Sequence, residues 1–174
     1  MKISLARINI ILALVLIPLL GCKTTEEKTK AKEATFLRLF LETNRDGTGH
    51  NFDIQVYRAS PITLTVERDA VLDEGFMQAA DLVDVDALGG VGIKITFTDD
   101  GARRLDNLTT ANKGRHLAVQ ASWTESRWLA APLITRRISN GVLVFTPDAS
   151  REEVERIVNG LKNVIKKLQA PYVF

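Results

Sequence analysis

The chain has 174 residues, of which 45% are hydrophobic and 25% charged, a composition typical of one folded domain with a sizeable core. Its net charge of +2 comes from Lys2 and Arg7, because the residues from Cys22 onward contain equal numbers of basic and acidic side chains. A chain that is neutral after its leader lacks the basic surface that binding to phosphates requires, so we expect no nucleic-acid partner.

The first 22 residues have the layout of a bacterial secretory leader. Lys2 and Arg7 form a short positive segment, and an apolar run over residues 8–20 ends just before Cys22. The run is too short to span a bilayer comfortably, although an uncleaved membrane anchor is the alternative interpretation. The letters LLGC resemble the lipobox of bacterial lipoproteins, in which the cysteine is lipidated and becomes the first residue of the mature chain. We therefore expect a signal peptide over residues 1–21 and lipidation of Cys22.

The residues after the leader predict a tether followed by one folded domain. Residues 23–34 are charged or small and include no large apolar side chain. Such a segment cannot form a core, so we expect a flexible tether over residues 22–35 and a single domain over residues 36–170. Lipidation implies the bacterial cell envelope, with the domain facing the periplasm. Lys23 after the cysteine favours the outer membrane, by resemblance to lipoprotein sorting patterns.

Hydrophobic alternation and β-branched residues predict a series of strands in the domain. Pro61 precedes the third strand, and Gly89 and Gly90 mark the turn of a hairpin between the fourth and the fifth. The expected strands cover residues 36–42, 52–58, 62–68, two segments on either side of Gly89 within 79–98, then 117–123, 133–138 and 142–145.

Two segments have helical spacing instead. Apolar residues at every third position predict a helix over residues 101–113, with Asp99 or Asp100 as its N-cap. A capping box at Ser150 begins a second helix, which reaches Leu168 along one apolar stripe. Such a stripe must pack on other apolar side chains, and the strands supply them. We therefore expect an α+β domain, in which a mostly antiparallel β-sheet has two α-helices packed on one face.

No group of residues predicts catalysis or a bound cofactor. The turn Asp99-Asp100-Gly101 has one glycine and two carboxylates that would repel an anion, so capping explains it better than phosphate binding. His50 and His116 are the only imidazoles, no nucleophile elbow accompanies them, and no Cys/His spacing suits zinc. We therefore expect a protein that is not an enzyme, with no cofactor and no small-molecule substrate.

The loop from Glu42 to Asp53 partly matches a calcium-binding loop. Its oxygen ligands would be Glu42, Asn44, Asp46 and Asp53, and Gly47 occupies the position of the sharp turn in that motif. The flanking residues look like strands, however, where the motif has helices. A hairpin loop that uses Asn, Asp and Gly for left-handed conformations explains the same letters, and we expect this loop, with calcium binding as the alternative.

Both tryptophans lie near one expected connection between strands. Trp123 and Trp128 flank Arg127, and exposed Trp and Arg side chains are typical anchors for a protein partner. The alternative is that the rings fold back onto the sheet, because tryptophan is usually largely buried. If partner binding occurs, we expect it at Trp123, Arg127 and Trp128.

The order of these elements resembles a known family over most of the chain. The residues that carry the resemblance are VGIKITFTDDGARRLDNLTTANKGRHLAV at 91–119, AAPLITRRISNGVLVFT at 130–146 and DASREEVERIVNGLK at 148–162. In order and spacing they are similar to the head subdomain of the first large periplasmic domain of SecD, the accessory subunit of the bacterial Sec translocase. Ser122 and the tryptophan-bearing loop depart from the family pattern, which has an acidic residue and a tight turn there.

The resemblance implies a role in protein export. SecD-type proteins use proton flow through membrane helices to move their periplasmic domains, and no such helices follow the domain up to Phe174. We therefore expect only a passive ability to bind exported polypeptide, or a component of the Sec translocase, in a lipid-anchored protein. The alternatives are a structural or interaction lipoprotein with no translocation role, and a calcium-binding module through Glu42 to Asp53.

Overall fold

The computed structural model describes residues 33–47, 49–85 and 90–170. The predicted signal peptide, the lipidation site Cys22 and most of the predicted tether lie outside these ranges and stay predictions. None of the helices in the described ranges has the length and the apolar character that a membrane crossing requires.

Within these ranges the chain forms eight strands, one turn of 3-10 helix and two α-helices. In chain order the elements are β1 (Phe36–Leu41), β2 (Asn51–Val56), β3 (Ile62–Glu67), the 3-10 turn η2 (Glu74–Phe76), β4 (Met77–Asp84), β5 (Val91–Phe97), α3 (Asp99–Ala111), β6 (Leu117–Ser122), β7 (Ser126–Ala130), β8 (Val142–Phe145) and α4 (Arg151–Gln169).

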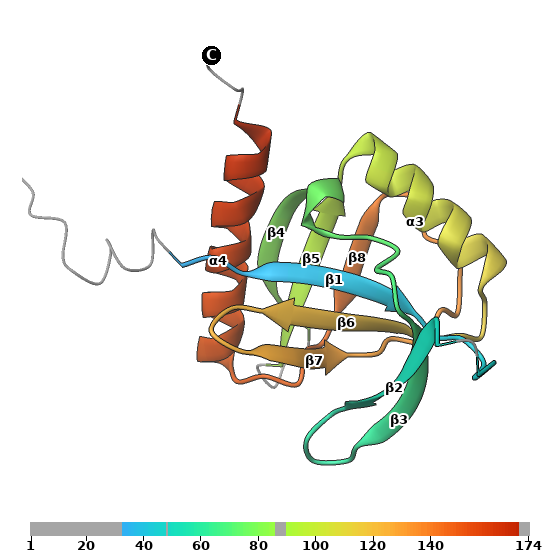
Figure 1. Cartoon of the computed structure of the whole chain (residues 1–174). Helices are drawn as coiled ribbons and strands as arrows, with labels where there is room; N and C mark the ends of the chain where they lie inside the picture. The colour runs from blue at the N-terminus through green and yellow to red at the C-terminus, as the bar shows by residue number, and fades with distance from the viewer. Residues whose placement is uncertain (1–32, 48, 86–89, 171–174) are drawn as a thin grey trace, which may run out of the picture.

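The strands form three small antiparallel sheets. One has the order β1-β6-β7, the second has the order β4-β5-β8, and the third pairs β2 with β3. In Figure 1 the strands of the first sheet run across those of the second, and the β2–β3 hairpin projects away from both. The prediction of an α+β domain with mostly antiparallel strands and two helices is confirmed, whereas the one sheet that we expected is divided into three.

One main core combines side chains from both three-stranded sheets and both helices. Its fully buried side chains include Leu39, Ile93, Leu105, Ile157 and Leu161. The apolar stripe of α4 therefore packs on the strands, as the spacing of its residues predicted. A smaller cluster lies under the β2–β3 hairpin and includes Phe40, Val66 and Ala131.

The first helix begins and ends two residues earlier than the predicted range of 101–113. The N-cap of α3 is Thr98, not Asp99 or Asp100. Thr98 has an extended backbone, its Oγ1 accepts a hydrogen bond from the N–H of Gly101, and its carbonyl accepts one from Ala102. Both aspartates therefore lie in the first helical turn, where their negative charge suits the positive end of the helix dipole.

The start of α4 is as predicted. The side chain of Ser150 accepts a hydrogen bond from the N–H of Glu153, and the carboxylate of Glu153 accepts one from the N–H of Ser150 at 2.8 Å. This reciprocal pair satisfies two backbone donors that the helix cannot pair internally.

One predicted strand is wrong. Residues 133–138 form no strand, and β7 lies at Ser126–Ala130 instead. Within that segment the N–H of Ile134 donates to the carbonyl of Arg115, and the carbonyl of Ile134 accepts from Gly114. The apolar letters there reflect a loop that is tied to the turn after α3 through the buried Ile134, not a strand with its own ladder.

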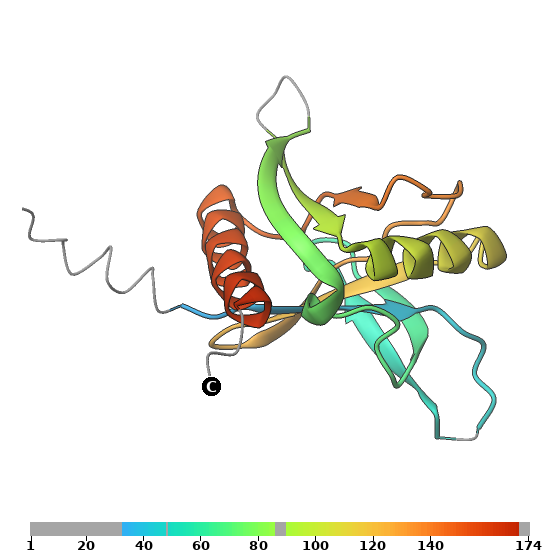
Figure 2. The ribbon, with the colours of Figure 1, turned by 90° about the horizontal axis from the view of Figure 1, so that it is seen from above.

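The chain enters the domain along α4. Thr35 is buried next to Gly160, and the side-chain amide of Asn163 donates to the backbone carbonyl of Glu33 at 2.9 Å. Figures 1 and 2 show this segment passing beside α4 before β1 begins. The last residues of the predicted tether therefore pack on the fold.

This packing makes Gly160 sensitive to substitution. In an exposed helix, Gly→Ala stabilises by about 1 kcal/mol. An alanine methyl at position 160 would instead meet Thr35, with the Thr35 backbone nitrogen 3.0 Å away and its hydroxyl closer still. We expect Gly160→Ala to lower the free energy of unfolding by about 1–2 kcal/mol, measured by chemical denaturation.

The exposed neighbour Asn159 gives the matched control. Asn159→Ala should leave stability unchanged or raise it slightly, because it improves helix propensity without a new contact. A Gly160→Ala protein that is more stable than the unaltered chain would show that Thr35 is not packed against α4.

Candidate functional site

The predicted partner loop is a hairpin whose two tryptophans lie on opposite faces. Trp123 packs against the main core, whereas Trp128 packs against the smaller cluster. The ring of Trp128 meets Phe40 edge-on, with 5.1 Å between the ring centroids, and lies 6.3 Å from the ring of Phe52. Both tryptophans are half-buried. The structure therefore does not bring the two rings into one exposed surface, and each of them packs onto the fold.

Arg127 holds β7 against the start of α4. Its Nη1 donates to Glu153 at 3.0 Å, and its Nη2 donates to the backbone carbonyl of Asp148 at 2.6 Å. Its guanidinium also lies 5.7 Å from the ring centroid of Trp123. The N–H of Ser150, together with Arg127, holds the pKa of Glu153 below its usual range. Arg127 therefore has structural partners and little free surface.

Glu42, the first residue of the calcium hypothesis, is paired with His116. Its carboxylate accepts a hydrogen bond from the N–H of His116 at 2.7 Å, and the same oxygen lies 2.8 Å from Nδ1 of that ring. Burial would raise the pKa of Glu42, but these contacts together outweigh it and lower the pKa. The pair joins the end of β1 to the residue before β6.

The other three predicted calcium ligands have partners within their own loop. Asp53 forms an ion pair with Arg45 at 2.6 Å, and Asp46 accepts a hydrogen bond from the side-chain amide of Asn51 at 2.7 Å. The backbone carbonyl of Asn44 accepts a hydrogen bond from the same amide at 3.3 Å. Among the described residues, no three His, Cys, Asp or Glu side chains come together in a way that could hold a metal ion. The structure therefore does not assemble the predicted calcium ligands.

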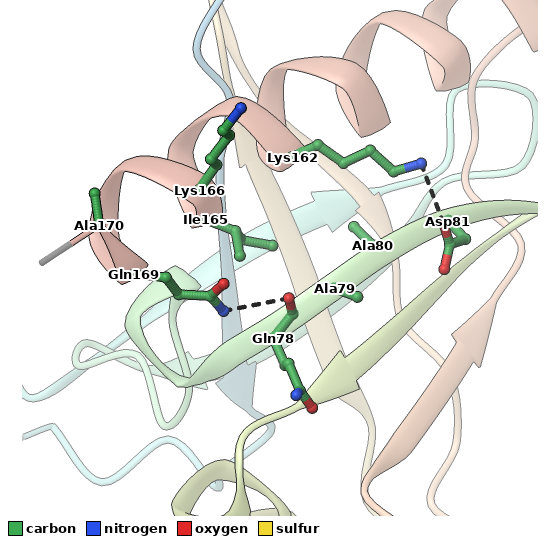
Figure 3. Close-up of a pocket in the computed structure, with 9 residues that line it drawn as sticks. All are labelled: Gln78, Ala79, Ala80, Asp81, Lys162, Ile165, Lys166, Gln169 and Ala170. Carbon is green, nitrogen blue, oxygen red and sulfur yellow. Dashed lines mark hydrogen bonds and ion pairs between the residues drawn. The ribbon is translucent and has the colours of Figure 1, made fainter.

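A groove of 440 Å³ lies between α4 and the outer strand β4 (Figure 3). Two side chains of α4 reach across it to the strand. The amide of Gln169 donates to the backbone carbonyl of Gln78 at 3.3 Å, and Lys162 forms an ion pair with Asp81 at 3.1 Å. These contacts hold the second half of α4 beside the strand.

A second groove, of 510 Å³, runs beside β8, and we call it the β8 groove. Its walls are formed by residues 132–140 and by the first three residues of the strand, together with Thr109 and Leu117. Two of the apolar side chains that line it, Leu133 and Val144, are 48% and 49% exposed. This amount of exposed apolar surface beside a strand suggests a place where another chain could bind.

Three of the four outer edges of the two three-stranded sheets are each contacted by another part of the chain. At β1, Leu39 exchanges backbone hydrogen bonds with Val71 and Leu72. At β7, the carbonyl of Leu129 accepts a hydrogen bond from the N–H of Asp148 at 2.7 Å. At β4, the side-chain amide of Gln169 in α4 donates to the backbone carbonyl of Gln78. Such contacts are one way in which proteins limit uncontrolled pairing at sheet edges.

At the fourth edge, that of β8, no described segment contacts the backbone except Asn140 just before the strand. In antiparallel pairing the N–H and C=O groups of alternate residues point toward the neighbouring strand. The N–H of Phe97 donates to the carbonyl of Gly141, and this fixes the alternation along the β5–β8 pair. Val142 and Val144 therefore direct their backbone N–H and C=O groups away from β5.

Val144 is the free position on this edge. The N–H of Val142 donates to the side chain of Asn140 at 3.2 Å, whereas no hydrogen bond within the described part of the chain uses the N–H or C=O of Val144. An exposed strand edge beside a groove with half-exposed Leu133 and Val144 has the features that allow an extended polypeptide to add as a further strand. The β8 groove is therefore the candidate binding site.

The sequence predicted β8 but not its open edge. Residues 142–145 were expected to form a strand, and valines suit a buried strand and an edge strand equally. One signal was present: β8 is only four residues long, and very short strands are typical of sheet edges.

SecDF proteins match this chain both in sequence and in structure. No protein-family model matches the chain. Among curated proteins, the chain is similar to the protein translocase subunit SecDF of Thermus thermophilus, with 29% identity over 106 residues. The match covers 56% of this chain and 14% of the relative, so the chain corresponds to a small part of that protein.

Two solved structures of SecDF have a similar fold. One, described as a membrane component that enhances protein export, gives a TM-score of 0.56 at 18% identity and covers 83% of this chain and 71% of that chain. The other, SecDF in its super-membrane-facing form, also gives 0.56 at 18% identity and covers 80% and 21%. The predicted resemblance is confirmed: the chain is SecD-like in sequence and in fold.

Proposed function

We propose that this chain is a lipid-anchored, non-enzymatic protein of the bacterial cell envelope that binds extended polypeptide during protein export. The similarity to SecDF, a membrane component that enhances protein export, supports the connection with export. The leader and Cys22 support the lipid anchor.

The open edge of β8 is the observation that carries the proposal. Backbone hydrogen bonds at a strand edge are independent of the partner's sequence, as a protein that meets many exported polypeptides requires. Leu133 and Val144 would add apolar contact to these bonds. The site therefore favours extended, partly apolar segments over folded proteins.

The size of the site indicates weak and reversible binding. About two or three new backbone hydrogen bonds would contribute about 1 kcal/mol each. Covering two half-exposed apolar side chains would add about 1 kcal/mol each. Association itself costs at least about 4 kcal/mol, so the net affinity is low. A polypeptide in transit must also leave, which low affinity allows.

Partner binding at Trp123, Arg127 and Trp128 stays a prediction. Each of these side chains already packs against the fold or forms a hydrogen bond within it. A partner that used them would have to displace those contacts, whereas the open edge of β8 requires no displacement.

A structural lipoprotein with no translocation role is the second candidate. The chain matches only 14% of the length of its curated relative, so the export activity of the whole relative need not accompany this domain. In that case the β8 groove would hold a strand of another envelope protein.

A proline at position 144 tests the binding mode. Val144→Pro removes the open N–H without disturbing the β5–β8 hydrogen bonds, because that N–H points away from β5. We expect the affinity for a fluorescent peptide of alternating valine and serine, measured by anisotropy, to fall about fivefold, the contribution of one backbone hydrogen bond.

Val144→Thr serves as the control, because it keeps both the N–H and a β-branched side chain. This variant should bind within about twofold of the unaltered chain, and thermal melting should show that both variants are folded. Equal peptide affinity in Val144→Pro and the unaltered chain would refute strand addition at β8.

Crosslinking in cells tests the connection with export. A photoreactive amino acid at position 144 should capture a precursor whose export has been arrested. The same group at Phe52, which is 37% exposed on the β2–β3 hairpin, should capture much less of it. Capture of a defined envelope protein but no precursor would favour the structural candidate, and equal capture at both positions would contradict the site.

A further inference from the structure

From Arg156 onward, every charged side chain of α4 is basic. No acidic residue follows Glu155 in the sequence, whereas four basic residues do. They are all exposed on α4: Arg156, Lys162, Lys166 and Lys167.

Helical geometry places these four side chains on one face. At 100° per residue they fall within an arc of about 140°, and Asn159 and Asn163 lie between them. We call this surface, from Arg156 to Lys167, the basic face of α4. The buried stripe of the helix lies on its other side, so the face is turned away from the core.

Most of this charge has no internal partner. Lys162 forms an ion pair with Asp81, but both side chains are about half exposed. Among the described residues, Arg156, Lys166 and Lys167 form no ion pair. Glu152 and Glu155 precede the face on the same side of α4, and Asn163 binds the backbone carbonyl of Glu33.

Helix electrostatics explain only part of the pattern. Lysines in the last turn, here Lys166 and Lys167, stabilise the negative end of the helix dipole. That effect is confined to the last turn, so it accounts for neither Arg156 nor Lys162. A single-signed face that extends over three turns indicates an anionic partner.

The tether restricts what that partner can be. Glu33 lies against this helix, and only residues 23–32 separate it from Cys22. Ten residues span at most about 36 Å when fully extended, and about 18 Å on average as a flexible coil. A lipid on Cys22 would therefore hold α4 close to the membrane surface.

We propose that the basic face of α4 rests on the anionic phospholipid headgroups of the membrane that holds the anchor. The proposal relies on the lipid anchor of the proposed function. Each lysine near an anionic membrane raises the equilibrium constant for contact between the basic face and the membrane about fivefold at moderate salt. The anchor keeps the domain at the membrane, and the basic face then sets its orientation.

Lysine acetylation measured by mass spectrometry tests this orientation in the full-length protein. The protein, isolated from membranes, would be reconstituted on vesicles of phosphatidylcholine alone or with phosphatidylglycerol. We expect Lys166 and Lys167 to react about fivefold more slowly on the anionic vesicles, and high salt should abolish the difference. Lys113, exposed just after α3, is the internal control and should react equally on both.

Equal acetylation of Lys166 and Lys167 on both kinds of vesicle would overturn the proposal. Flotation of the same samples reports the anchor separately. If the protein does not float with either vesicle, or Cys22 has no lipid by mass spectrometry, the anchor of the proposed function fails instead. Slower acetylation of Lys166 and Lys167 that persists in Arg156→Glu would also count against a shared basic face.

Discussion

A sheet of three strands always has two edges, and the backbone groups of each edge must be paired, covered or left to solvent. That constraint organises this fold, because neither three-stranded sheet closes on itself. Loop backbone contacts the outer edges of β1 and β7, and Gln169 of α4 contacts that of β4. On the outer edge of β8, beside the β8 groove, the N–H and C=O of Val144 have no partner among the described residues.

The helix α4 contacts the main core, the outer strand β4 and the segment by which the chain enters the domain. Its apolar stripe fills the main core, its side chains close the edge of β4, and Gly160 and Asn163 receive the chain as it enters the domain. Because β4 and β8 are the two outer strands of one sheet, the closed edge lies on the α4 side and the open edge on the other. A membrane-facing α4 would therefore leave the β8 groove accessible.

Local sequence patterns predicted most helices and strands well, but they did not predict which strands pair with one another. The capping box at Ser150 and the apolar stripe of α4 depend on residues a few positions apart, so the sequence was sufficient for them. The division into three sheets depends on pairings between distant strands, and neither it nor the open edge at Val144 could be deduced from spacing. Nor could the letters from Glu42 to Asp53 show that Glu42 pairs with His116, far away in the chain.

Strand addition at β8 depends most directly on the backbone N–H of Val144. Amide hydrogen exchange measured by NMR, residue by residue, reports it in the full-length protein. In the free protein, Val144 should exchange rapidly while its neighbour Leu143, hydrogen-bonded to β5, is protected. A bound extended peptide should then slow the exchange of Val144 at least about fivefold, the contribution of one backbone hydrogen bond. Protection of Val144 in the free protein, or unchanged exchange at saturation with peptide, would contradict an open edge that binds polypeptide.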